Sequence, residues 1–219
     1  MASTLIKDVI EFTPILLEGA VVTVQVTLAS LVLSTLIGLG WALMRTSGIP
    51  VLATASKIFV NLIRGIPILV ILFYVYFVLP EFGIQLSAFL AGTIGLGIAY
   101  SAYMAEAFRS GIEAIDAGQV EAAQSIGMRK WMIMRRVILP QAFKISLPPY
   151  GNNLVMMLKD SSQTSAITVA ELAMQSKLIA ASSFKNMTVF SMGAIGYLLL
   201  SIPLIYFVSR LEKKFGKSK

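Results

Sequence analysis

Long uncharged stretches alternate with short polar or basic segments along this chain. Three stretches, Gly19–Met44, Phe82–Ala105 and Asn186–Ser209, contain no charged residue over 24 or more positions. A helix needs about 20 mostly apolar residues to cross the hydrocarbon core of a bilayer. Each stretch therefore predicts a membrane-spanning helix.

Small and polar residues inside these stretches predict how the helices pack. In lipid, hydroxyl and amide side chains do best when they hydrogen-bond to another helix, and small residues let two helix backbones approach closely. Phe82–Ala105 carries three glycines, Gly92, Gly95 and Gly97. Gly19–Met44 should have one face packed on protein, marked by Thr23, Gln25, Thr27, Ser30, Ser34 and Thr35.

A further span is expected between Val51 and Leu79, but it is interrupted. The stretch is apolar except for Lys57 and Arg64, and Gly65 and Pro67 follow directly. Proline removes a backbone donor and clashes with the preceding turn, so a kink is predicted there.

The remaining span is the least regular one. Ile145–Leu158 is uncharged but only 14 residues long, so its helix should begin earlier, near Val137. Residues 160–185 are too mixed to span. The pattern predicts an all-α integral membrane protein, one domain over residues 1–219, with about five spans at residues 16–44, 52–79, 86–108, 137–159 and 186–209.

Composition supports a lipid environment. The 219 residues are 57% hydrophobic and 13% charged, with a mean hydropathy of +0.81, whereas soluble domains are about a quarter charged. Cysteine and histidine are both absent. Their absence excludes disulfides, a thiolate nucleophile, the usual zinc ligands and histidine acid–base catalysis. No catalytic residue, metal site or bound cofactor is predicted.

Lysine and arginine gather in segments that alternate along the chain, which predicts the orientation. Cytoplasmic loops carry the excess of these residues, so the net charge of +7 needs no nucleic-acid partner. With five spans, the N-terminus would lie outside and the C-terminus in the cytoplasm. The basic segments contain Arg45 and Lys57, then Arg109, Arg129, Lys130, Arg135, Arg136 and Lys144, then Arg210, Lys213, Lys214, Lys217 and Lys219.

The start of the chain does not read as a cleavable leader. It mixes Lys7 with Asp8, Glu11 and Glu18 before an apolar run of 26 residues. A signal peptide has a basic start and a much shorter apolar core. The first apolar run is therefore expected to remain as a span.

The central loop predicts a short helix with a cap at each end. Asp116 and Gln119 fit a capping box, in which Gln119 would reach back to the cap residue. The helix would run over residues 117–126, and Gly127 would close it in the left-handed conformation. Glu121 would lie near the positive end of the helix dipole. Such a helix, rich in small residues, is suited to docking in a groove of another protein.

The same loop resembles the EAA signature of binding-protein-dependent ABC importer permeases. The match consists of Glu121-Ala-Ala123, Gly127 and Leu139-Pro140, with Val137 where the family has isoleucine. No phosphate-binding Gly-x-x-x-x-Gly-Lys-Ser/Thr motif occurs in the chain. The resemblance implies a cytoplasmic coupling helix between spans 3 and 4 that inserts in a cleft of a separate ATPase. Its coupling residues would be Asp116, Glu121, Ala122, Ala123 and Gly127.

Other motifs resemble the polar amino-acid branch of that family, over nearly the whole chain. The resemblance implies a pore-forming permease subunit, paired with a second copy or a sister permease. An extracytoplasmic substrate-binding protein or domain would deliver the amino acid, and ATP and Mg²⁺ would bind to the ATPase. The chain would be a multi-pass protein of a bacterial inner membrane, in contact with lipid. These motifs are Arg64-Gly-Ile-Pro67, Ala102-Tyr-Met-Ala-Glu106, Arg109-Ser-Gly-Ile112, Leu139-Pro-Gln-Ala142 and Leu158-Lys-Asp-Ser161.

Candidate substrate contacts follow from the position of Arg64 and from the resemblance. If the second span starts at Val51, Arg64 lies about 20 Å along it. A cation at that depth costs roughly 2.5–3.5 kcal/mol unless it faces protein or water. Arg64 would either bond carbonyls freed at the break or contact substrate. The resemblance implies a pathway position for Asp160, which could receive an ammonium, and for Ser161; the alternative is an ordinary outer loop. Tyr103, Asn153 and Met157 complete the candidate set.

A second class of function stays open from the residues alone. An ion-gradient-driven secondary transporter or channel subunit would also span the membrane several times. Such proteins use inverted repeats or acidic residues within the membrane. No repeat is evident, and Glu106 is the only acid near the middle of an apolar stretch. A neighbouring ATPase gene would separate the two classes.

Overall fold

The structure is a computed structural model that describes residues 2–215. Over that range the chain is all helical, as predicted, and no strand forms. The tail residues Lys217 and Lys219 lie outside the described range. The elements are α1 (Ala2–Thr46), α2 (Pro50–Gly65), α3 (Ile68–Phe73), a π-helix η1 (Tyr74–Val78), a 3₁₀-helix η2 (Leu79–Phe82), α4 (Ala88–Glu113), α5 (Ala117–Ser125), α6 (Lys130–Ile133), a π-helix η3 (Met134–Ile138), α7 (Leu139–Asp160), a 3₁₀-helix η4 (Ser161–Ile167), α8 (Leu172–Ser183) and α9 (Asn186–Phe215).

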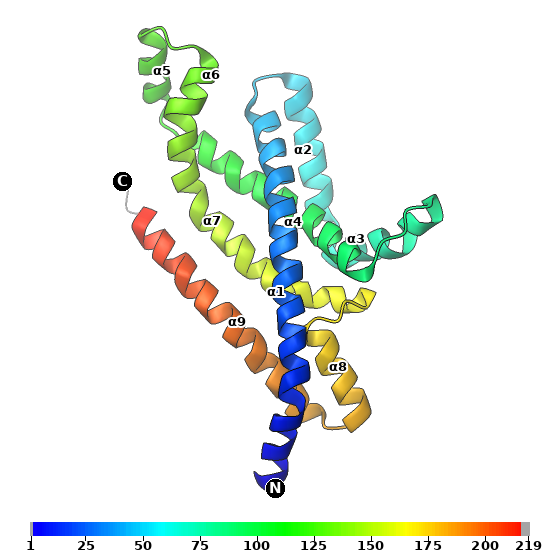
Figure 1. Cartoon of the computed structure of the whole chain (residues 1–219). Helices are drawn as coiled ribbons and strands as arrows, with labels where there is room; N and C mark the ends of the chain where they lie inside the picture. Colours follow the sequence, from blue (N-terminus) through cyan, green and yellow to red (C-terminus); the bar gives the residue numbers. More distant parts are fainter. Residues whose placement is uncertain (1, 216–219) are drawn as a thin grey trace.

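The centre of the fold is the contact between α1 and α4. These helices share the most extensive helix–helix contact in the described structure, and α1 runs almost the full length of the molecule (Figure 1). Glycines bring the backbones together, as predicted for α4. A Cβ atom on Gly97 would lie 2.6 Å from Leu33 Cδ2.

The predicted polar face of α1 is largely confirmed. Four of its hydroxyl residues are buried, and Ser30 Oγ donates to the Thr93 carbonyl of α4 over 3.1 Å. Gln25 is exposed, so its inclusion in that face was wrong. At 100° per residue it points well away from Thr23, which is buried.

Close packing at Gly38 of α1 gives a testable stability effect. A Cβ atom there would lie 2.7 Å from Met104 Cβ and 2.8 Å from the Ser101 carbonyl oxygen, so the two helices would have to separate. Gly38→Ala should therefore destabilise the chain by about 1–3 kcal/mol. Gly40 is the matched control, because a Cβ atom there meets nothing within 4 Å. Thermal unfolding of the purified variants measures the difference, and equal stability of both variants would show that the α1–α4 contact is loose.

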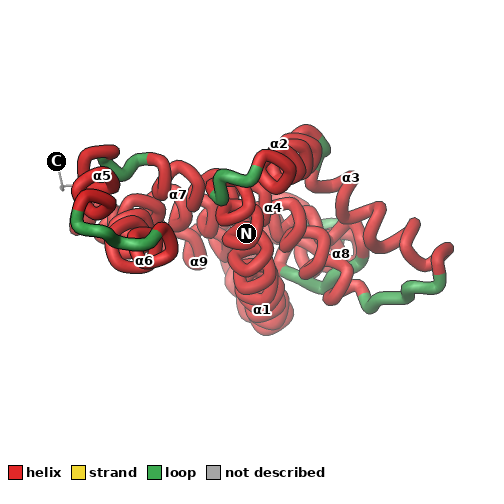
Figure 2. The backbone as a smooth tube through the Cα atoms, turned by 90° about the horizontal axis from the view of Figure 1, so that it is seen from above, coloured by secondary structure: helices red, strands yellow, loops and turns green. Residues whose placement is uncertain are grey.

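The second predicted span is broken more sharply than a kink. α2 and the following segment Ile68–Phe82 meet at 99°. Ile66, the residue before Pro67, is extended, with φ −100° and ψ 132°, which is the conformation that a following proline favours. Gly65 and Pro67 therefore end one helix and start another. Seen from above, α3 projects to one side of α1 while α5 and α6 lie on the other (Figure 2).

The number of spans depends on how two irregular elements are counted. Among the described residues, α1, α4 and α9 are long and apolar enough to cross a membrane, and the bent pair would make a fourth span. α7 corresponds to the fourth predicted span, at residues 137–159, but it does not meet the same criterion over its 22 residues. It carries Lys144, Asn152, Asn153 and Lys159. Its helix continues backward through η3 and α6 to Lys130, seven residues before the predicted start at Val137.

The N-terminal part of α1 is helical well before the predicted span start at residue 16. Phe12 and Leu16 pack into a small core with Leu172, Ile179 and Val189 of α8 and α9. Nearby, Lys185 Nζ donates to Asp8 Oδ1 over 2.6 Å. These contacts fasten the N-terminal end of α1 to the hairpin formed by α8 and α9.

Candidate functional site

The predicted short helix of the central loop is present as α5 (Ala117–Ser125). Asp116 caps it, since its Oδ1 accepts the Gly118 N–H over 2.8 Å. At the other end Gly127 has φ +78°. The Gly127 N–H donates to the Gln124 carbonyl over 2.9 Å, and the Met128 N–H donates to the Ala123 carbonyl over 3.1 Å. This is the two-bond closure that a left-handed glycine permits.

The second half of the predicted capping box is wrong. Gln119 does not reach back to Asp116. Its Oε1 accepts a hydrogen bond from Gln141 Nε2 over 2.6 Å, and Gln141 also donates to the Val137 carbonyl over 2.9 Å. Gln119 therefore ties α5 to the first turn of α7 rather than closing the cap. Gln119 is thus bonded to a residue distant in the sequence, Gln141, and not to the neighbouring cap residue.

α5 stands at one end of the molecule, with α6 beside it (Figure 1). Of the five coupling candidates only Ala123 is buried, while Asp116, Glu121, Ala122 and Gly127 are exposed. A cavity of about 560 Å³ lies beneath α5, bounded by the ends of α1 and α4 and by η3. The Gln119–Gln141 hydrogen bond ties α5 to α7, while Ala117, Val120, Glu121 and Gln124 border this cavity. That arrangement leaves Asp116, Ala122 and Gly127 on the open surface of α5 and Glu121 at the edge of the cavity, where another protein can reach them.

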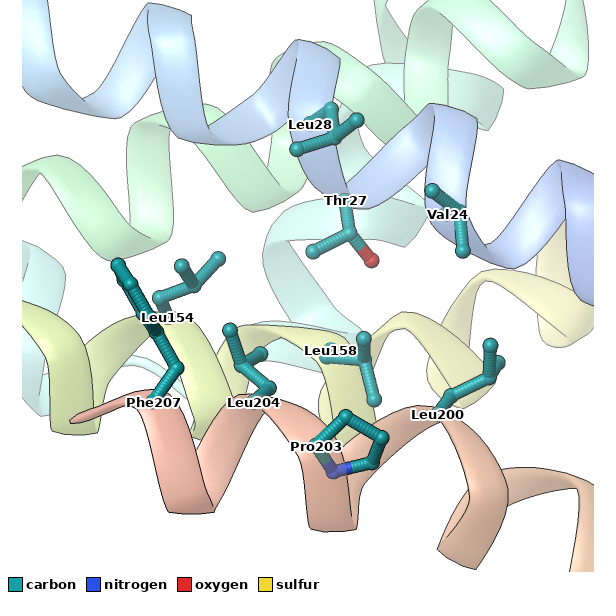
Figure 3. Close-up of a pocket in the computed structure, with 9 residues that line it drawn as sticks. All are labelled: Val24, Thr27, Leu28, Leu154, Leu158, Leu200, Pro203, Leu204 and Phe207. Atoms are coloured by element: carbon teal, nitrogen blue, oxygen red, sulfur yellow. The ribbon is translucent and has the colours of Figure 1, made fainter. Parts of the chain in front are cut away.

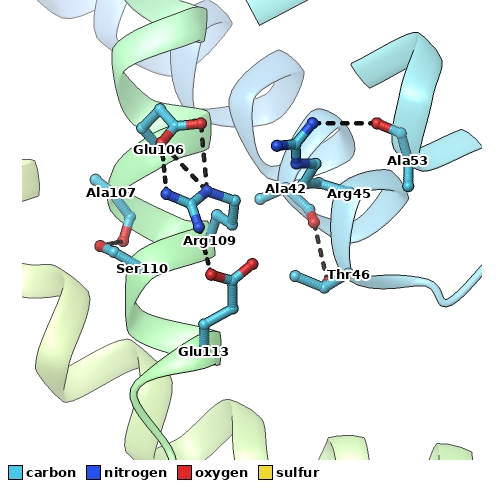
Figure 4. A network of polar contacts seen from close by, with 9 residues as sticks. All are labelled: Ala42, Arg45, Thr46, Ala53, Glu106, Ala107, Arg109, Ser110 and Glu113. Carbon is cyan, nitrogen blue, oxygen red and sulfur yellow. Dashed lines mark hydrogen bonds and ion pairs between the residues drawn. The ribbon is translucent and has the colours of Figure 1, made fainter. Parts of the chain in front are cut away.

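An ion-pair network lies at the adjacent end of α4 (Figure 4). Arg109 bridges two carboxylates one turn to either side, with Nη2 2.7 Å from Glu106 Oε2 and Nη1 paired with Glu113. On the neighbouring helices, Arg45 Nη1 donates to the Ala53 carbonyl over 3.3 Å. Glu113 also lines the cavity under α5, so this network reaches the coupling candidate.

Three of the predicted pathway residues are linked by aromatic rings. The Arg64 guanidinium lies 5.6 Å from the centre of the Tyr103 ring, and the Tyr103 and Tyr100 rings are 5.7 Å apart. Tyr100 Oη donates to Asp160 Oδ2 over 2.7 Å. The connection joins α2, α4 and α7. Arg64 has no carboxylate partner among the described residues.

The other predicted pathway residues are placed differently. Met157 is fully buried in the main core. Ser161 is also fully buried, and its hydroxyl donates to the Leu158 carbonyl over 2.7 Å, so it faces the helix backbone and not a cavity. Asn153 is partly buried, with Nδ2 3.9 Å from the Met104 sulfur.

Tyr100 and Glu171 are two polar residues that the sequence analysis missed. Tyr100 precedes Tyr103 by three residues, so helical spacing could have placed both on one face. Glu171 gave no such signal, because glutamate is not a favoured N-cap residue. It nevertheless caps α8: Oε1 accepts the Met174 N–H over 2.8 Å and Oε2 accepts the Ala173 N–H over 2.9 Å.

Glu171 also fastens α8 to the long helices. It is fully buried, Tyr197 of α9 donates to it, and the Leu172 N–H donates to Thr23 Oγ1 of α1 over 3.1 Å. Burial raises the pKa of the Glu171 carboxyl, and the hydrogen bonds from Tyr197 and the α8 backbone oppose that shift. The hydrogen bonds to the Glu171 carboxylate come from the α8 backbone and from Tyr197, so we assign Glu171 a structural role.

A groove between α1, α7 and α9 does not fit an amino acid. It has a volume of about 350 Å³. Figure 3 shows aliphatic and aromatic side chains pointing into it from all three helices, with Thr27 as its one hydroxyl. A zwitterion needs paired polar groups when it leaves water. The polar residues of the predicted pathway lie elsewhere.

The chain matches a family model described as the inner membrane component of binding-protein-dependent transport systems, over residues 34–217. Among curated proteins it is 39% identical over 210 residues to the probable amino-acid ABC transporter permease protein YckA of Bacillus subtilis, covering 96% of this chain and 93% of that protein. It is 34% identical over 203 residues to the glutamine transport system permease protein GlnP of Escherichia coli, covering 92% and 93%.

Solved structures agree with this grouping. The crystal structure of an amino acid ABC transporter with histidines aligns with a TM-score of 0.88 and 36% identity, covering 94% of this chain and 97% of the other. The inward-facing methionine ABC transporter MetNI aligns with a TM-score of 0.78 at 19% identity, covering 93% and 97%, and supports the fold alone. The chain belongs to the inner membrane components of binding-protein-dependent transport systems, among the permeases of amino-acid ABC importers.

Proposed function

We propose that this permease forms, with a second permease chain, the pore of an importer for a polar amino acid, driven by a separate ATPase. The observation that carries the proposal is α5: a short helix closed at both ends by Asp116 and Gly127 and exposed on its outer surface. A solvated loop would not require that double closure. A helix that transmits force to a partner must keep its shape, which the two caps provide.

The proposed route for the amino acid follows α4 along its length. Tyr100, Tyr103, Glu106 and Arg109 recur every three residues and lead from Asp160 toward the end of α4 near α5, winding about half a turn around the helix. Arg64 stays exposed in the single chain. Exposed polar groups at membrane depth are tolerated beside protein or water. A second permease copy or a sister permease, related by a two-fold axis, would supply that cover.

In this proposal the chain has no catalytic group and binds no cofactor or metal. ATP and Mg²⁺ bind to the ATPase subunit, and a substrate-binding protein or domain delivers the amino acid from outside. Several of the relatives, among them GlnP of Escherichia coli, are named as glutamine permeases, which favours a polar substrate.

We also propose that α5 and the end of α9 face the cytoplasm and that the N-terminus faces outward. α9 ends on the same side as α5, and the N-terminal end of α1 lies at the opposite end of the molecule (Figure 1). Arg210, Lys213 and Lys214 stand at that end of α9, in agreement with the positive-inside rule.

The function is tested by purifying the chain with its co-expressed ATPase and reconstituting both with the binding protein. We expect one polar amino acid to stimulate ATP hydrolysis several-fold, and only when the binding protein is present. Uptake should continue when ion gradients are dissipated and stop when ATP is withheld. Uptake that follows the ion gradient and ignores ATP would instead identify a secondary transporter.

A further inference from the structure

The segment that links α5 to α7 carries a strong and uncompensated positive charge. From residue 122 to residue 159 the sequence contains no Asp or Glu. Four cations lie together in and beside α6 and η3, namely Arg129, Lys130, Arg135 and Arg136, and all four are exposed. Within the described residues none of them takes part in an ion pair. Water and counterions can solvate such a surface, and its charge favours a negatively charged partner outside the chain.

The outer face of this segment is basic at one end and apolar at the other. Trp131, Arg135, Leu139 and Phe143 follow one another at intervals of four residues, and each is exposed, Trp131 at 58% and Phe143 at 64%. Ile133, on the other side of the helix, is only 2% exposed. One continuous face therefore passes from a basic, tryptophan-bearing part to an apolar part.

That order matches the profile of one membrane leaflet. The uncharged stretch of α7, Ile145–Leu158, marks the part of this helix within the hydrocarbon. Phe143 and Leu139 come next toward α5, with the exposed Lys144 about 100° around the helix from Phe143, and then come the arginines and Trp131. Tryptophan is enriched at the membrane interface. Arginine binds phosphate through two parallel hydrogen bonds, which gives it a geometric fit to phospholipid headgroups.

We propose that the face formed by Trp131, Arg135, Arg136, Leu139 and Phe143, here called the basic face, binds anionic phospholipids at the end of the bundle that carries α5. The ATPase is the other conceivable occupant. The basic face, however, runs on without a break into residues suited to acyl chains, whereas a water-soluble subunit would meet the exposed surface of α5. The assignment of this end to the cytoplasmic leaflet rests on the proposed function; lipid binding itself does not.

The chain offers a direct probe, because it has two tryptophans and no cysteine. Trp41 is stacked on Phe59, with ring centres 4.2 Å apart. In a Trp41→Phe background, Trp131 is the only tryptophan, and lipids with brominated acyl chains quench it on contact. The full chain is placed in nanodiscs of phosphatidylcholine with a minor fraction of phosphatidylglycerol, and either one lipid or the other is brominated.

We expect brominated phosphatidylglycerol to quench Trp131 several-fold more, per mole fraction, than brominated phosphatidylcholine. Since one cation near an anionic surface is worth about a five-fold preference, Arg135→Gln with Arg136→Gln should bring the two quenching efficiencies close to equal, and high salt should reduce the difference too. Lys213→Gln with Lys214→Gln is the matched control at the same end of the molecule, and it should leave the preference unchanged. If the tryptophan variant does not fold, a fluorophore on Leu139→Cys reports the same contact.

Equal quenching by both lipids would overturn the proposal. Loss of quenching after addition of the purified ATPase would also overturn it, because the basic face would then belong to that partner. The measurement uses neither ATP nor amino acid and is indifferent to leaflet, so its failure is distinguishable from a failure of the proposed transport function.

Discussion

Gly127→Val should reduce amino-acid uptake about ten-fold or more while the amount of permease in the membrane stays normal. Gly127 adopts φ +78°, a conformation that costs a residue with a side chain roughly 1–2 kcal/mol and is worst for a β-branched one. The variant would lose the two hydrogen bonds that close α5 and would shift Glu121 and Ala122 away from the proposed contact with the ATPase. A deficit of about 1.4 kcal/mol in docking equals a factor of ten.

Gly48 provides the matched control for this experiment. It also has a positive φ, +74°, and a Cβ atom there meets nothing within 4 Å, but it lies in the connection between α1 and α2. Gly48→Val imposes a similar backbone cost away from α5, so uptake should change little. Uptake and ATPase association are measured together for both variants. If Gly127→Val transports normally, or if both variants fail equally, α5 has no special coupling role.

The caps of α5 show which features of this protein are local enough to predict. Asp116 needs only the N–H groups of the next turn, and Gly127 needs only its own freedom to adopt positive φ. Both depend on a few consecutive residues, and both were found where predicted. The close contacts of the α4 glycines were predictable for a similar reason, since a missing side chain has the same consequence whatever helix lies opposite.

Features that depend on long-range partners were not predictable in the same way. The sequence predicted Gln119 as part of a capping box, yet its side chain accepts a hydrogen bond from Gln141, 22 residues later. Ser161 looked available to a substrate, yet its hydroxyl bonds the Leu158 carbonyl. The outcome in each case depended on which atom lay nearer in the folded chain. Sequence spacing limits the possible hydrogen-bond partners of a side chain but does not determine which of them it binds.

The break in the second span depends partly on neighbouring residues and partly on long-range packing. Pro67 fixes the conformation of Ile66, so the interruption itself is a local effect. The direction of the following segment, at 99° to α2, depends on how α3 packs on α4, where Gly95 admits Leu72. As a consequence Arg64, at the end of α2, lies over the ring of Tyr103. The residues around Arg64 in the sequence do not predict this partner.

Asp160→Asn should weaken amino-acid uptake by roughly ten- to one-hundred-fold in apparent affinity, with normal abundance of the permease. The estimate corresponds to the loss of one charge-assisted hydrogen bond, worth about 1.5–3 kcal/mol. Every amino acid carries an ammonium group, and Asp160 is the only acidic side chain in the connection from Arg64 through Tyr103 and Tyr100. The asparagine keeps the shape, and its carbonyl can still accept the hydrogen bond from Tyr100.

Tyr100→Phe separates the charge of Asp160 from its hydrogen bond. The phenylalanine variant keeps the carboxylate but removes the donor that lies 2.7 Å from Oδ2. Tyr100 is almost fully buried, so this change should cost about 1 kcal/mol of stability and alter affinity less than Asp160→Asn does. Initial uptake rates over a range of substrate concentrations, with membrane abundance from immunoblots, distinguish the two effects. If both variants lose abundance and neither loses affinity, Asp160 only braces α4 against α7. If Asp160→Asn changes neither quantity, the amino acid passes elsewhere, and the polar residues of α4 do not line its route.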